Sequence, residues 1–173
     1  RFFIRAVRHF QDQITDPNLK RDIAAFTAQE HMHTREHVDY NTRLERSGFP
    51  AKYLEDKLAK RIAWAEAVFP QKRQLAITCA LEHFTAILAH QMLSDPDAFE
   101  ASDNTYKQLW FWHAYEETEH KAVAFDVLKS VSGGLTGYLL RIRAMLFATM
   151  IFNIRIARHS FSLLRAKKNH TSW

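Results

Sequence analysis

With 173 residues, 47 % of them hydrophobic and 25 % charged, the chain has the size and composition of one soluble globular domain, which excludes an intrinsically disordered chain. Its single cysteine, Cys79, excludes an intrachain disulfide and a metal site built from several thiolates; it suits a reducing compartment, so we expect a cytoplasmic location. The formal charge of +5 is uneven, because the last acidic residue is Asp126: residues 127–173 carry +8 and residues 1–126 carry −3.

Apolar residues recur at helical spacing along the chain and no segment alternates as a strand would, so we predict an all-α fold. Prolines, glycines and capping residues divide the pattern into helices over residues 1–14, 17–48, 51–68, 70–93, 104–130 and 136–168. Asp16, followed by Pro17, and Asp103 are predicted N-caps. We interpret the chain as a single domain in which residues 1–132 form a bundle, while residues 135–168 form a helix packed on it or on a partner.

Two Glu-x-x-His patterns stand within two of these helices, Glu30 with His33 and Glu117 with His120. A carboxylate and an imidazole three residues apart on a helix project from one face about a turn apart. Two such pairs, with further glutamates on the other helices, form the arrangement by which helical bundles hold two metal ions. The patterns therefore predict a metal centre inside the bundle.

The predicted ligands lie on apolar stripes, which indicates that they are buried. One stripe reads Ile23, Phe26, Glu30, His33, His37, Tyr40 and Leu44. A second contains Leu109, His113, Glu116 or Glu117, His120, Ala124 and Val127, and a third contains Leu75, Cys79, Glu82, Ala86 and Ala89. A buried charge must be paired or bind a metal, because its desolvation is otherwise costly. A metal site is thus the first interpretation, and a buried polar network is the alternative.

The depth of these residues along their helices also matches. Glu82 lies twelve residues before Ser94 and Glu117 lies fourteen after Asp103, which places them within about 3 Å of one level in an antiparallel pair. The matching position on the first helix falls near residue 1, where the sequence has no carboxylate. Two interpretations follow: the chain is a fragment and the fourth carboxylate lies just upstream of Arg1, or the site is incomplete.

Four further residues are expected to support the ligands through hydrogen bonds from a second layer: Gln29, His113, Glu116 and Asp126. Gln29 and Glu116 each precede a ligand histidine by four residues, where a side chain can reach the free ring nitrogen. Spacing alone leaves open whether Glu116 or Glu117 is the ligand.

Three segments resemble a bacterial family of predicted metal-dependent hydrolases, a branch of the ferritin-like proteins. They read Gln29-Glu30-x-x-His33-x-x-x-His37, Glu82-His83, and His113-x-x-Glu116-Glu117-x-Glu119-His120 followed by Asp126. The resemblance implies a ferritin-like four-helix bundle with a short crossover helix, an added C-terminal helix and a binuclear site. It implies the ligands Glu30, His33, Glu82, Glu117 and His120, with His37 as an additional one.

The expected cofactors are two divalent metal ions, with iron first and manganese or zinc as alternatives, since carboxylates and imidazoles suit all three. We expect oxidation that depends on oxygen or peroxide, of a substrate that the sequence does not identify. One alternative is hydrolysis of an ester or amide by metal-bound water, and His33-Thr34-Arg35-Glu36-His37 also fits the inverted zinc-protease pattern. A further alternative is a non-catalytic iron-binding or interaction module.

The basic C-terminal helix gives separate expectations about partners. Its longest uncharged run, residues 144–154, is too short to span a bilayer. We expect this helix to pack on the bundle or form a homodimer first, and to contact an anionic membrane surface at the inner face second. Nucleic acid is not expected, because the basic residues alternate with aliphatic ones.

Overall fold

The computed structural model describes residues 1–95, 97, 99, 100 and 102–170, with the backbone alone at residues 120 and 168–170. Its helices are α1 (Phe2–Arg8), a short 3-10 helix (Gln11–Gln13), α2 (Pro17–Arg46), α3 (Ala51–Val68), α4 (Gln71–Ser94), α5 (Asn104–His120), α6 (Val123–Val131) and α7 (Gly134–His170). No strand occurs within these described ranges. The prediction of an all-α helical bundle is confirmed.

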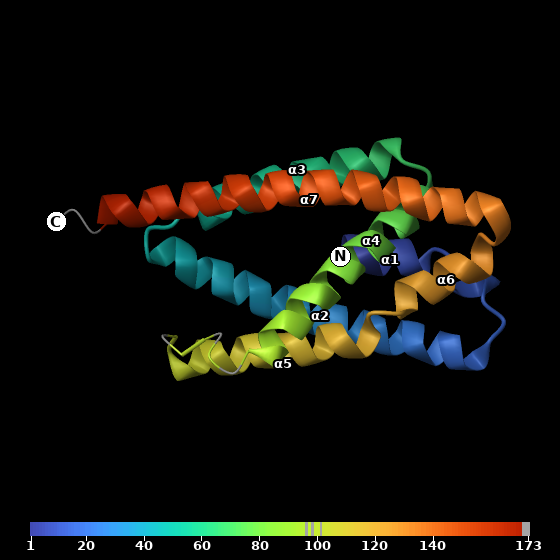
Figure 1. The fold of residues 1–173 in the computed structure, drawn as a ribbon, viewed down its shortest axis with the longest axis horizontal. Helices are drawn as coiled ribbons and strands as arrows, with labels where there is room; N and C mark the ends of the chain where they lie inside the picture. Colours follow the sequence, from blue (N-terminus) through green and yellow to red (C-terminus); the bar gives the residue numbers. More distant parts are fainter. Residues whose placement is uncertain (96, 98, 101, 171–173) are drawn as a thin grey trace.

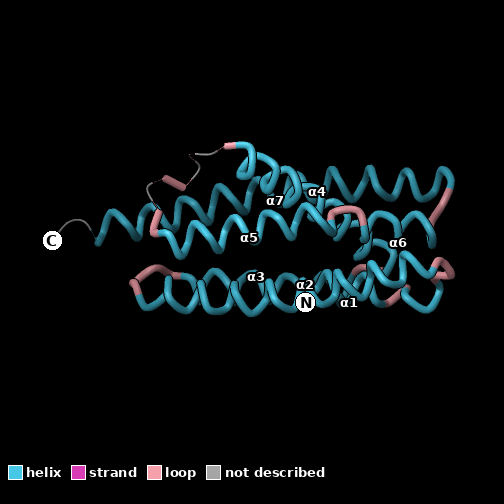
Figure 2. The backbone as a smooth tube through the Cα atoms, turned by 90° about the horizontal axis from the view of Figure 1, so that it is seen from below, coloured by secondary structure: helices cyan, strands magenta, loops and turns pink. Residues whose placement is uncertain are grey.

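Helix α4 is the element around which the others are arranged. It crosses the molecule diagonally from the side of α3 and α7 to the side of α5 (Figure 1), and it packs most extensively against α5 and α7. Figure 2 shows α2 and α3 running together in one layer, with α4, α5 and α7 in the other. A side chain on α4 can therefore face the bundle on one side and α7 on another.

The helix starts predicted from caps are confirmed. The Asp16 carboxylate accepts a hydrogen bond from the amide of Asn18 at 2.9 Å, and the Asp103 carboxylate accepts one from Thr105 at 2.9 Å. Each satisfies an amide that has no partner within the first turn of its helix. Gly48, with φ of 85°, follows the end of α2, where its backbone adopts a conformation that a side chain would strain.

Two predicted helices are shorter than the sequence pattern indicates. The first ends at Arg8 rather than near residue 14, because the amide of Phe10 bonds to the carbonyl of Val7 and the chain tightens into a 3-10 turn. The helix predicted over 104–130 is interrupted at Lys121 and Ala122 and resumes as α6. This break lets α6 turn toward α4 and α2, and Val123, Ala124, Val127 and Leu128 are all buried there.

The apolar core lies where α1, α2, α4 and α6 meet. Its largest fully buried apolar side chains are Val7, Ile23, Phe26, Leu75, Val127 and Leu128. Removing such side chains from water supplies roughly 1.5–3 kcal/mol each. Ile23 and Phe26 stand on the same stripe of α2 as Glu30, so the hydrophobic core continues directly into a polar cluster.

Helix α7 is long and leaves much of its apolar surface exposed, including Leu135, Leu146 and Phe161. Over Gly134–Lys167 it is long and apolar enough to cross a membrane, with a mean hydropathy of 1.4 in its most apolar window, of which 17 % is buried. The sequence-based statement concerned only the uncharged run, residues 144–154; the whole helix is long and apolar enough by length and composition, which for a single helix is weak evidence of a membrane span. Contact with a second copy or with a lipid surface stays a prediction.

Candidate metal centre

Two of the predicted ligands come from one turn of α2. Glu30 and His33 are only 8 % and 4 % exposed, and Nδ1 of His33 lies 3.5 Å from Oε1 of Glu30. They follow Ile23 and Phe26 on the buried stripe, so the packing that buries those apolar residues also takes the polar pair out of water. His37, one turn further, lies at the exposed edge with its ring centroid 6.4 Å from that of His33.

Helix α5 supplies the facing half of the cluster through His113, Glu116 and Glu117. Nε2 of His33 approaches Oε2 of Glu116 to 2.7 Å, and Nδ1 of His33 lies 3.6 Å from Oε1 of Glu117. The same Glu117 oxygen lies 3.6 Å from Nε2 of His113. The His33 and His113 rings are 4.4 Å apart between centroids, so both imidazoles converge on one carboxylate.

This convergence fits a metal ion. His33, His113 and Glu117 each offer a ligand atom, and the three atoms lie within 4.8 Å of one another. Ligand atoms on one ion at about 2.1 Å stand roughly 3–4 Å apart, which matches the two separations of 3.6 Å. The second oxygen of Glu117, Oε2, is buried and accepts no hydrogen bond from the described residues. Two histidines and one carboxylate form a donor set for zinc or iron(II).

The carboxylates set the protonation of His33. Burial acts to lower its pKa, but a hydrogen bond to Glu30 and the charges of Glu30, Glu117 and Glu116 outweigh burial and leave the pKa raised. The pKa of His37 is lowered instead, by loss of water around the ring and then by the neighbouring His33. The rings of His33, Trp110 and His113 lie near the His37 ring, which explains the loss of water, although part of the residue stays exposed. The inner position of the cluster thus attracts positive charge, and the outer one does not.

Glu82 is a fourth buried carboxylate, on α4. Glu82 is only 1 % exposed, although several other residues of α4 are exposed to solvent. It lies on the face of α4 that also carries the buried Leu75 and Thr78, whereas the next residue, His83, is exposed. Because α4 packs against α5, Glu82 extends the acidic character of the bundle interior beyond the three ligand candidates.

The structure assigns other surroundings to several predicted residues. Gln29 donates a hydrogen bond to Glu119 at 2.9 Å, not to a cluster histidine. Asp126 is exposed on α6, and no ion pair joins it to a histidine in the described part of the chain. The side chain of His120, the last residue of α5, lies outside the described residues. Glu36, central to the inverted zinc-protease pattern, pairs with Arg35 at 3.0 Å.

Aromatic side chains close the outer side of the cluster. The ring centroid of Trp112 is 5.5 Å from that of His33, and those of Trp110 and His113 are 5.6 Å apart. Tyr40 packs edge-on to Trp110 at 5.4 Å. Beside His33, His37 and His113 these rings leave a cavity of only about 10 Å³, on the scale of one water molecule. The sequence analysis gave His113 only a supporting role.

The position of His113 contained a signal for its role. It lies four residues before Glu117, one turn away on the same face of the helix, so the two side chains can reach one ion. The Glu-x-x-His patterns do not include it, because they have a spacing of three with the carboxylate first.

Comparison with known proteins agrees with a metal site. The sequence model of one family, described as "Predicted metal-dependent hydrolase", matches residues 1–173. No curated protein and no solved structure is significantly similar to the chain, so its placement among the ferritin-like proteins stays a prediction. With the match extending over all of its residues, the chain belongs to the family of predicted metal-dependent hydrolases.

Proposed function

We propose that the chain is a metal-dependent enzyme whose bundle holds two divalent metal ions, and that it catalyses oxidation by oxygen or peroxide. For this chemistry iron is the first expectation and manganese the alternative; zinc, which has no redox chemistry, fits only the hydrolytic candidate below. The observation that carries this proposal is the excess of buried carboxylates beside only a few imidazoles. Glu30, Glu82 and Glu117 are each less than 9 % exposed, and Glu116 approaches His33. Four carboxylates balance the charge of two divalent ions, whereas one ion would leave buried negative charge uncompensated.

The residues divide into two groups under this proposal. His33, His113 and Glu117 would hold one ion, and Glu30 and Glu82, with His120, would contribute to the second. Glu116 would orient the imidazole of His33 through Nε2, the usual task of a carboxylate beside a ligand histidine. Such a metal pair, when bound, supplies electrons to oxygen or peroxide. Trp110, Trp112 and Tyr40 would keep bulk water out and admit only a small reactant.

A second candidate function is hydrolysis of an ester or amide. The family description favours it, and two histidines with one glutamate form a ligand set of zinc hydrolases. In that case a metal-bound water would be the nucleophile, and the water-sized cavity beside His33 and His113 would hold it.

Metal analysis tests the shared part of both candidates. We expect about two metal ions per chain after purification, and loss of at least one of them in the variants His33→Ala and His113→Ala. His31→Ala is the matched control, because His31 is exposed on the same helix two residues before His33 and should leave metal content unchanged. Equal metal content in all four proteins would contradict a site at this cluster.

The chemistry is tested after anaerobic loading with iron(II) and, separately, with zinc. Oxidation predicts oxygen uptake and a near-ultraviolet absorption change in the iron form, both abolished by Glu82→Gln. Hydrolysis predicts cleavage of p-nitrophenyl esters by the zinc form without oxygen uptake by the iron form, with His113→Ala inactive. Oxygen uptake that persists in Glu82→Gln would contradict the part given to this carboxylate.

A further inference from the structure

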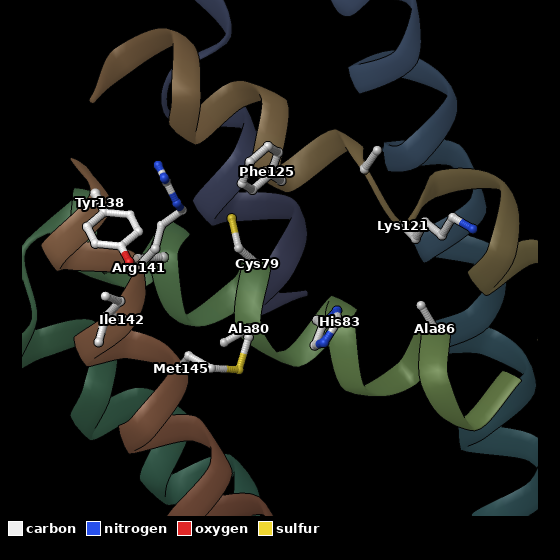
Figure 3. A pocket seen from close by; sticks show the side chains of 12 residues that line it. Cys79, Ala80, His83, Ala86, Lys121, Phe125, Tyr138, Arg141, Ile142 and Met145 are labelled. Atoms are coloured by element: carbon white, nitrogen blue, oxygen red, sulfur yellow. The ribbon is translucent and has the colours of Figure 1, made fainter. Parts of the chain in front are cut away.

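A second cavity lies on a different face of α4 from the metal cluster. Its volume is about 440 Å³, within the usual size range of small-molecule sites, roughly 300–1,000 Å³. It is bordered by α4, by the junction of α5 and α6, and by the first turns of α7, and it is open to solvent (Figure 3). None of the candidate metal ligands lines it, so the two sites can be tested separately.

The cavity exists because α4 presents small side chains where α7 crosses it. Ala76, Ala80 and Ala86 line the α4 wall, and Ile142 and Met145 of α7 form the opposite one. Figure 3 shows Cys79 and Ala80 on α4 near Ile142 and Met145 of α7, with Ala86 further along α4 and away from α7. Most of the cavity wall is therefore apolar and suits a hydrocarbon body, with the imidazole of His83 as a polar group between Ala80 and Ala86.

Both charged residues that line the cavity are cations. Arg141 lies at the α7 end and Lys121 at the opposite end (Figure 3). The guanidinium of Arg141 lies over the rings of Phe125 and Tyr138, with its central carbon 5.3 Å and 5.9 Å from their centroids, which restrains it at the rim. Among the described residues no ion pair joins Arg141 or Lys121 to a carboxylate, so an anion entering the cavity meets two cations with charge available.

Two nearby carboxylates oppose this positive field. Burial is the main cause that raises the pKa of the Cys79 thiol; the charges of Glu82 and, more weakly, Asp126 raise it further, and Arg141 lowers it. Neither carboxylate lines the cavity, whereas Arg141 does. An anionic group would thus be attracted by Arg141 and repelled, at longer range, by Glu82 and Asp126.

From this combination of an apolar body and cationic ends, we propose that the cavity binds an amphiphile with one anionic group, of the kind represented by a medium-chain fatty acid. Its carboxylate pairs with Arg141, and its hydrocarbon chain lies along Ala80 and Ala86. The proposal uses a separate set of side chains from the metal cluster, and the two sites are coupled through the charge of Glu82, which acts at Cys79.

Calorimetric titration of the full chain with decanoate, below its micelle concentration, tests the proposal. We expect saturable binding of about one decanoate per chain and no comparable binding of decylamine, which has the same chain and the opposite charge. Arg141→Gln should weaken decanoate binding about ten- to a hundredfold through loss of a charge-assisted bond. Arg143→Gln is the matched control, since Arg143 is exposed two residues further along α7 and does not line the cavity.

Two more variants test where the ligand lies. Asp126→Asn should strengthen binding severalfold by removing one opposing charge, and Ala86→Phe should abolish it by filling the cavity. Circular dichroism and metal content of Ala86→Phe confirm that the bundle is intact. Equal affinity for decanoate and decylamine, equal loss in Arg141→Gln and Arg143→Gln, or undiminished binding in a folded Ala86→Phe would each overturn the proposal.

Discussion

Two faces of α4, about a quarter of a turn apart, carry opposite kinds of side chain. One face turns into the bundle and buries a carboxylate, Glu82, beside Leu75 and Thr78. The other faces α7 and carries alanines around a cavity of about 440 Å³. The acidic face is fully packed around its charge, and the apolar face is left with space. The difference indicates that charge is buried on this helix where a ligand could compensate it, and space is left where a ligand could fill it.

Cys79 lies at the boundary between these faces. Loss of water around its thiol raises the pKa to about 12, and the negative charge of Glu82 adds to this increase. Cys79 also lines the cavity, so one side chain is affected by the acidic face and borders the apolar one. The two environments are therefore electrostatically coupled across α4, although no residue assigned to one is needed by the other.

The largest effect is expected from putting a charge on the wrong face. Ala76 is 1 % exposed and lines the cavity, so Ala76→Lys buries an ammonium group in a cavity whose charged lining residues, Arg141 and Lys121, are also cations. We expect the free energy of unfolding to fall by about 3 kcal/mol or more in urea denaturation. Ala59→Lys, at an exposed position of α3, is the control and should cost less than about 1 kcal/mol. Similar losses in both variants would show that the apolar face tolerates charge as well as the surface does.

A somewhat smaller effect is expected where α7 begins and defines the cavity wall. A Cβ on Gly137 would lie 1.8 Å from the carbonyl oxygen of Ser132, so Gly137→Ala must displace α7 from the end of α6. Overpacking of this kind costs roughly 1–3 kcal/mol, and we expect weaker decanoate binding together with lower stability. Gly133→Ala is the matched control, because nothing lies within 4 Å of its Cβ position. A Gly137→Ala protein as stable as the control would mean that the α6–α7 contact does not fix the wall.

The acidic face should respond in opposite directions with and without metal. Glu82→Gln replaces a buried charge by a neutral amide, so in the presence of a chelator we expect the free energy of unfolding to rise by about 1 kcal/mol. In the metal-loaded protein the same variant should be less stable than the original, because a ligand is lost and metal binding stabilises the folded state. Thermal unfolding under both conditions measures the two values, and the same sign in both would argue against Glu82 as a ligand.

The sequence predicted much of this comparison from local rules. The caps Asp16 and Asp103 and the bounds of α3 follow from short-range chemistry, and the buried positions of Glu30, His33 and Glu82 follow from helical periodicity. The interruption at Lys121 and Ala122 was not predictable in this way, because neither proline nor glycine marks it and the apolar stripe continues across it. There the packing of α6 overrides a locally favourable helix.

Two features that the sequence did not predict depend on how helices meet. The approach of His113 to Glu117 and His33 requires the facing of α2 and α5, which spacing within one helix does not give. The cavity beside Cys79 requires the angle at which α7 crosses α4, and alanines on a helix otherwise predict close packing. A pattern within one helix thus predicts which residues are buried, but not whether two helices touch at that point.

The smallest effect concerns the boundary residue and depends on pH. The pKa of Cys79 rises from an ordinary 9.0 to about 12 on folding, so above pH 9 the unfolded chain loses the thiol proton while the folded chain keeps it. Stability then falls as the pH rises, by up to about 1.4 kcal/mol per pH unit. Cys79→Ser lacks this contribution, and its stability relative to the original protein should be unchanged between pH 7 and 8 and rise by about 1 kcal/mol between pH 8 and 10. A difference that stays constant to pH 10 would place Cys79 in contact with water, and would remove the coupling between the two faces of α4.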